Sequence, residues 1–175
     1  MKTKLLFLFL NIPFISFSQS FDSKYTQFEL STPLKINSHR GETNADGSEN
    51  EYFFLPDGLS AKIGYGIHFE EWVSVGFHTG IDWKAYEKLV AVPIFANFKL
   101  SPEITENGRI VLQFGIGKAL TIGQKGKSGV YKRYNLGYQN SDGLLFFIDI
   151  STYNFSVNNS SSIGAFSVGI ALVSF

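Results

Sequence analysis

The sequence predicts an all-β protein in which eight antiparallel strands close into a single up-and-down barrel. Apolar and polar residues alternate with a period of two through most of the chain, and no stretch has a convincing helical period. The alternating segments number eight, and residues typical of turns separate them. With 175 residues, 44% of them hydrophobic, the chain suits one domain with a substantial core.

Residues 1–18 have the features of a cleavable secretory signal peptide. They begin with two lysines, continue as a largely apolar run that ends at Phe17, and place Ser16 and Ser18 two residues apart. The apolar run is shorter than the roughly 20 residues that a transmembrane helix requires. We therefore expect cleavage after Ser18, which leaves residues 19–175 as the folded domain.

The clearest alternation runs through two consecutive segments, Leu59–Phe69 and Val73–Lys84. In both segments the odd positions carry mostly apolar side chains, and the even positions carry glycine or polar residues. Because the apolar residues of paired strands must share one face, the numbers of paired residues must add up to an even number. A three-residue turn that pairs Phe69 with Val73 satisfies this condition.

The same period predicts six further strands. In chain order they are Gln27–Ile36, Val90–Leu100, Arg109–Ile122, Val130–Gln139, Leu144–Ser156 and Ile163–Phe175. Pro33 and Pro93 lie inside two of these strands. Proline cannot donate a hydrogen bond to a neighbouring strand, so we expect a β-bulge at each.

Alternation alone does not say whether the apolar face points into a soluble barrel or outward into lipid. Glycine is frequent on the polar face, where it would make room inside a narrow barrel. Strands of ten or more residues match the 9–11 or so that cross a bilayer. Aromatic residues lie at both ends of the apolar stripes of the hairpin, Phe69 and Trp72 at one end and Trp83 and Tyr86 at the other. These features favour a transmembrane barrel with apolar residues outside.

The polar face carries charges of both signs, which would then meet inside the barrel. We predict a polar network in the lumen formed by Glu29, Lys62, His78, Asp82, Arg133 and Asp149. Lys62 and Asp82 are diagonal neighbours in the predicted hairpin, so we expect an ion pair between them. Leu145 and Phe147 would also project inward. A lumen filled in this way makes bulk porin activity unexpected.

The segment Gly58–Leu100 combines a strand rich in glycine and tyrosine, a short turn and a strand in which Pro93 precedes alternating apolar residues. With Ser18-Gln19 and a final Phe175, this pattern resembles the small, porin-like outer-membrane β-barrel proteins of Bacteroidota. The resemblance implies a place in the outer membrane of a Gram-negative bacterium and recognition by the barrel assembly machinery. It implies no catalytic residue. Phe175 lies on the polar parity of the last strand, which departs from the usual pattern.

No pattern in the sequence predicts catalysis, a cofactor or a metal site. The chain has no cysteine. His78 is expected opposite Gly64, four residues along the strand from His68, so the two histidines would lie roughly 13 Å apart, too far for one metal to bridge. His68 is expected opposite Ser74, which leaves an outer-membrane enzyme acting on lipid as a less favoured hypothesis. No third member of a triad and no oxyanion site accompany this pair. Fifteen basic and fifteen acidic residues give no electrostatic case for binding nucleic acid.

Two connections carry opposite charge. A lysine cluster formed by Lys125, Lys127 and Lys132 is suited to the phosphates of lipopolysaccharide, whereas the long connection Asn37–Gly58 is acidic. The simpler explanation is that both are solvated loops that attract each other. We therefore expect a monomeric outer-membrane protein of structural or surface-interaction type, in contact with membrane lipid and lipopolysaccharide. A secreted or periplasmic soluble β-barrel that binds an apolar ligand is the alternative.

Overall fold

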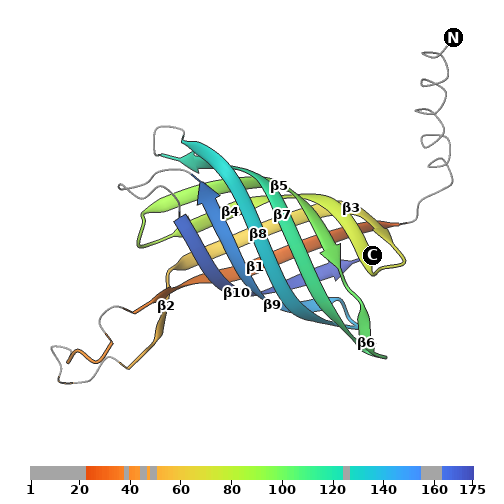
Figure 1. The fold of residues 1–175 in the computed structure, drawn as a ribbon, viewed down its shortest axis with the longest axis horizontal. Coiled ribbons are helices and arrows are strands. Elements are labelled where there is room, and N and C mark those ends of the chain that lie inside the picture. The colour runs from red at the N-terminus through yellow and green to blue at the C-terminus, as the bar shows by residue number, and fades with distance from the viewer. Residues whose placement is uncertain (1–22, 38–39, 44–46, 48–50, 124–126, 155–162) are drawn as a thin grey trace, which may run out of the picture.

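The computed structural model describes residues 23–37, 40–43, 47, 51–123, 127–154 and 163–175, and eight long antiparallel strands form its barrel (Figure 1). These strands are β1 (Lys24–Ile36), β3 (Gly58–Phe69), β4 (Val73–Lys84), β5 (Leu89–Leu100), β7 (Gly108–Ile122), β8 (Ser128–Asn140), β9 (Leu144–Asn154) and β10 (Ile163–Ser174). Each corresponds to one predicted strand, so the predicted fold class is confirmed. Two three-residue strands were not predicted: β2 (Phe54–Pro56) pairs with β1, and β6 (Glu103–Thr105) pairs with β7.

The barrel closes because the last long strand pairs with the first. β10 and β1 are antiparallel in an unbroken register from Thr26 opposite Ser174 to Leu34 opposite Phe166. The other long strands pair in the order β10-β9-β8-β7-β5-β4-β3-β1. Each long strand therefore has a hydrogen-bonded neighbour on both sides, which satisfies backbone groups that an open sheet would leave unpaired.

The register of the first hairpin agrees with the sequence prediction. Phe69 pairs with Val73 across a three-residue turn, and His78 lies opposite Gly64. In this turn Glu70 and Glu71 both have positive φ angles, 48° and 59°. The even sum of paired positions holds along the whole hairpin, so both strands present their apolar residues on the same face.

The predicted bulge at Pro93 is wrong. Pro93 pairs with Ala119 in an unbroken register with β7. On its other edge, β5 pairs with β4. The pairing is interrupted between the Thr79–Ile94 pair and the Asp82–Ala91 pair, and the register is the same on both sides of this gap. The missing N–H group removes one hydrogen bond from the ladder without adding a residue to either strand.

Pro33 also lies in a regular strand, and the irregularity is found in the chain that faces it. β1 pairs with β3 as far as Ser31–Ser60 and with β2 from Leu34–Pro56, so the facing chain contains one extra residue. There the backbone N–H of Asp57 donates to the carbonyl oxygen of Pro33 at 2.7 Å. The bulge predicted within the strand of Pro33 is thus replaced by a register shift in its neighbour, where the sheet passes from β3 to β2.

The two ends of the barrel differ. The N-terminal end of β1, the C-terminal end of β10, β6 and the turn between β3 and β4 lie at one end, here called the termini end. The opposite end carries β2, which projects beyond the barrel with the end of β1 (Figure 1). This β2 end also carries the turn between β4 and β5 and the connection between β7 and β8.

Apolar side chains point outward and polar side chains point inward, the reverse of a water-soluble protein. On the outer face, for example, Phe77 is 76% exposed and Ile116 is 61% exposed. On the inner face, Arg133 and Lys99 are almost completely buried. A soluble barrel that binds an apolar ligand would require the opposite arrangement. In the described part of the chain, no helix is long and apolar enough to cross a membrane.

Candidate functional site

The middle of the barrel is occupied by three charged side chains from three strands, here called the central ion cluster: Glu29 of β1, Arg133 of β8 and Asp149 of β9. The guanidinium of Arg133 donates to both carboxylate oxygens of Glu29, at 3.0 and 2.6 Å. Its Nε donates to Asp149 at 2.5 Å. All three residues are buried. The fork geometry of arginine makes this bidentate pairing possible, which lysine would not provide.

Two aromatic rings lie close to the guanidinium of this arginine. The guanidinium carbon lies 5.5 Å from the ring centre of Phe147 and 6.0 Å from that of Phe95. Both rings are buried, and Leu145, two residues before Phe147, is fully buried as well. Leu145 and Phe147 thus point into the barrel, as the alternation predicts. The rings exclude water from the ion pairs, which strengthens the attraction between the charges and raises the cost of separating them.

His78 lies next to the central ion cluster. Its Nδ1 is 3.5 Å from a carboxylate oxygen of Glu29, and its Nε2 is 3.1 Å from the hydroxyl of Tyr25. The imidazole occupies the space over Gly64 on the neighbouring strand, where a Cβ atom would overlap the ring. Glycine at this position is therefore required by the size of the histidine opposite.

A second group of charges, here called the hairpin ion cluster, consists of Ser60, Lys62, Asp82 and Tyr153. Lys62 donates to Asp82 at 2.7 Å and to the hydroxyl of Ser60 at 2.5 Å. Ser60 and Tyr153 also donate to the two oxygens of Asp82. Lys62 and Asp82 are diagonal neighbours in the register of β3 and β4, in agreement with the predicted ion pair.

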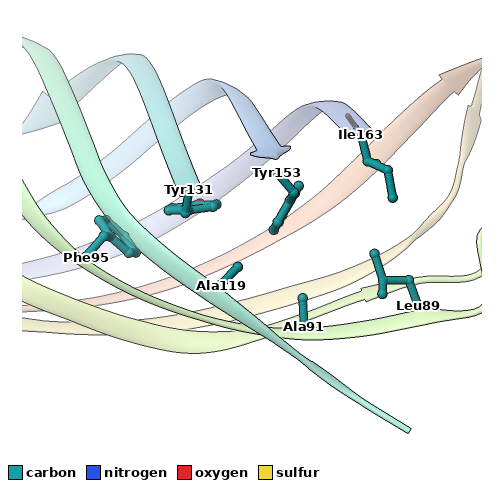
Figure 2. Close-up of a cluster of buried hydrophobic side chains, with 7 residues drawn as sticks. All are labelled: Leu89, Ala91, Phe95, Ala119, Tyr131, Tyr153 and Ile163. Carbon is teal, nitrogen blue, oxygen red and sulfur yellow. The ribbon is translucent and has the colours of Figure 1, made fainter. Parts of the chain in front are cut away.

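From the central ion cluster toward the β2 end, apolar and aromatic side chains fill the lumen around the hairpin ion cluster. Figure 2 shows this plug, which consists of Leu89, Ala91, Phe95, Ala119, Tyr131, Tyr153 and Ile163. The rings of Phe95, Tyr131 and Tyr153 follow one another with centroid distances of 5.0 and 5.2 Å. A second cluster contains Tyr25, Val111, Leu145, Phe147, Ala171 and Val173. Side chains therefore fill the interior, as expected for a narrow barrel.

At the termini end, Arg109 and the ring of Phe175 contact side chains from other segments. Arg109 Nη2 donates to Glu71 at 2.8 Å and to Glu103 at 2.7 Å. The ring of Phe175 contacts the ring of His68 edge-on at 4.8 Å and lies 4.7 Å from the ammonium of Lys99. Phe175 thus follows the polar parity that its position in the sequence indicates.

His68 and Ser74 lie opposite each other but do not form a hydrogen bond. Ser74 Oγ is buried without a hydrogen-bond partner, whereas His68 Nδ1 accepts a hydrogen bond from the backbone N–H of Glu71 at 3.2 Å. This arrangement lacks the nucleophile–base contact that hydrolysis needs. Within the described ranges, no three histidine, aspartate or glutamate side chains come together as a metal site. His39 lies outside the described residues.

The predicted lysine cluster is only partly described. Lys125 lies outside the described residues, Lys127 is exposed in the connection between β7 and β8, and Lys132 is exposed on the outer face of β8. Lys118 of β7, which the sequence places on the apolar face, is also exposed and is a diagonal neighbour of Lys132 across the two strands. Only the register of β7 with β8 brings these two together, so the sequence alone did not group them.

An outward-facing groove of about 420 Å³ lies beside Lys118. Its walls include Phe77, Ile94, Ile116 and Leu120, and Ala96 and Gly117 form part of its lining. The small residues leave a shallow apolar channel on the surface of the barrel, and the lysine places a positive charge at its edge. An apolar channel with one cation suits a lipid acyl chain and its phosphate.

No family model matches the chain, and no curated protein matches it. Among solved structures it is similar to the attachment invasion locus protein Ail of Yersinia pestis, with 13% identity and a TM-score of 0.38. That match covers 87% of this chain and 97% of the Ail chain. A second structure of Ail, in complex with the heparin analogue sucrose octasulfate, matches with 14% identity and a TM-score of 0.32 over the same shares of the chains.

Proposed function

We propose that this chain is a monomeric outer-membrane β-barrel protein of structural or surface-interaction type, exported by the signal peptide in residues 1–18. The observation that carries the proposal is the reversed distribution of polarity: large apolar side chains cover the outside, while charged side chains are buried inside. Such a surface is stable only where lipid surrounds it. In a bilayer the backbone N–H and C=O groups must also be paired within the protein, and the closed ladder of hydrogen bonds pairs them.

The two ends then face different compartments. With the chain termini in the periplasm, the β2 end lies at the cell surface and displays Tyr52, Phe53 and Phe54, all about half exposed or more. Arg40 lies over the ring of Phe53 at 5.5 Å. Such an aromatic and cationic segment is suited to contacts with other molecules at the surface, while the filled barrel serves as its anchor.

Fractionation of the native host tests the membrane location. We expect the protein in the outer-membrane fraction, with a band on a denaturing gel that migrates differently before and after boiling. A closed barrel resists detergent until it is heated, because every long strand is paired on both edges. Recovery as a soluble protein whose mobility does not change with heating would overturn the proposal.

A second, more specific part of the proposal is contact with the phosphate of lipopolysaccharide or of another outer-leaflet lipid. The pair Lys118 and Lys132 supports it, since both side chains are exposed on the outer face and Lys118 lines the groove. Lys127 of the adjoining connection is also exposed, and Lys125 precedes it by two residues in the sequence. Two neighbouring cations on an apolar surface repel each other unless an anion lies between them.

The double variant Lys118→Ala, Lys132→Ala should retain several-fold less lipopolysaccharide after extraction in mild detergent, measured as bound phosphate per protein. Lys24→Ala is the matched control, because Lys24 is an exposed lysine at the other end of the barrel. Equal retention by the double variant and the control would refute this contact.

A further inference from the structure

We propose that the termini end holds a binding site for a small organic polycation of the polyamine kind, a site separate from the lipid contact. A pocket of about 430 Å³ opens between the β3–β4 turn, β6, the β8–β9 turn and the end of β10. Here it is called the mouth pocket. Its polar lining includes Glu71, Glu103, Glu106, Arg109, Gln139 and Asp142.

Carboxylates outnumber cations in this lining. Arg109 contacts two of the four acidic side chains, Glu71 at 2.8 Å and Glu103 at 2.7 Å. Its charge is therefore already shared between them. Glu106 and Asp142 are both exposed and add two further negative charges to the same pocket. The mouth pocket thus has a net negative charge that attracts cations into it.

A buried acceptor provides an independent sign of a ligand. Gln139 of β8 lines the mouth pocket and is only 3% exposed, yet its Oε1 has no hydrogen-bond partner. A buried amide oxygen without a donor costs free energy, and native proteins rarely leave one unpaired. A ligand with N–H groups that enters the pocket would supply the missing donor.

The spacing of the acidic groups favours an organic cation over a metal ion. Within the described ranges, no three acidic or histidine side chains lie close enough to hold one metal. A pocket of about 430 Å³ is also far larger than a single ion requires. A linear polyamine carries several ammonium groups at intervals along a flexible chain, so each can approach a different carboxylate while N–H groups remain for Gln139.

Calorimetric titration of spermidine into the purified, folded protein in uncharged detergent tests the proposal. We expect saturable binding that weakens with salt, because the attraction is between charges at a water-filled mouth. Glu106→Gln and Asp142→Asn should each weaken binding about two- to fivefold, and Gln139→Leu should weaken it about tenfold. Glu51→Gln, an exposed acidic residue beyond the opposite end of the barrel, should leave binding unchanged.

Absence of spermidine binding by the unaltered protein would overturn the site, as would an equal effect of Glu51→Gln. Displacement of spermidine by an equimolar amount of Mg²⁺ would show a metal site instead. Because Glu106 and Asp142 are exposed, their variants should fold even if Gln139→Leu does not. The titration does not require a membrane location, so its result is independent of the fractionation experiment.

Discussion

The two ion clusters inside the barrel are assembled from different kinds of neighbour. In the hairpin ion cluster, Lys62 and Asp82 lie on adjacent strands joined by one short turn. In the central ion cluster, Glu29 and Arg133 are 104 positions apart and lie on strands that are not neighbours in the sheet. The first pair can form in an isolated hairpin, whereas the second requires the barrel to be closed. The central ion cluster therefore forms only when the fold is complete.

The clusters also differ in what remains when a cation is removed. Without Lys62, Asp82 still accepts hydrogen bonds from Ser60 and Tyr153. Without Arg133, Glu29 keeps the hydrogen bond from Gln27 and lies near His78, but Glu29 and Asp149 both lose the cation that donates to them. Buried carboxylates without a counter-ion are among the most destabilising groups in a protein. This difference predicts a ranked series of variants.

The largest effect is expected for Arg133→Leu. It removes the guanidinium shared by two buried carboxylates, so the free energy of unfolding should fall by about 3–5 kcal/mol. The measurement is urea unfolding of the barrel in lipid vesicles, followed by tryptophan fluorescence. Lys132→Leu is the control, because the adjacent side chain points outward. An equal loss for the two variants would mean that the central ion cluster does not stabilise the barrel.

Lys62→Met should have a smaller effect, a loss of about 1–3 kcal/mol in the same measurement. Methionine retains most of the apolar stem, and Asp82 keeps its two hydroxyl donors. A loss as large as that of Arg133→Leu would contradict the distinction drawn between the clusters.

Tyr153→Phe should have the smallest effect, about 0.5–1.5 kcal/mol, because it removes one donor to Asp82 and leaves the ring in the plug. The matched control is Tyr131→Phe. The Tyr131 hydroxyl is buried without a hydrogen-bond partner, so its removal should be neutral or stabilising. If both variants lose the same free energy, the bond from Tyr153 makes no specific contribution.

The same contrast explains which features the sequence could predict. Alternation locates all eight long strands and their faces, since it is a local property with a period of two. It also predicts the Lys62–Asp82 pair, because one turn determines the register of that hairpin. The pairing of Glu29 with Arg133 depends on the register at closure and on distances across the lumen, which no local pattern contains.

Other features were missed for related reasons. β2 and β6 contain three residues each, too few for a period of two to be recognised. The grouping of Lys118 with Lys132 and the mouth pocket around Gln139 both depend on residues brought together from different strands. The strands of the two prolines contain no bulge, because proline removes a donor without requiring an extra residue in its own strand. Beside Pro33 the extra residue lies in the facing chain.

The pairing of β1 with β10 has a consequence for how the barrel forms. Thr26 pairs with Ser174, so β1 can pair with β10 only when the last strand of the chain is in place. Contacts between such distant positions slow folding, and an unpaired strand edge invites association with other chains. Until β10 pairs with β1, the partly folded chain therefore has two unpaired strand edges, through which it can associate with other copies of itself.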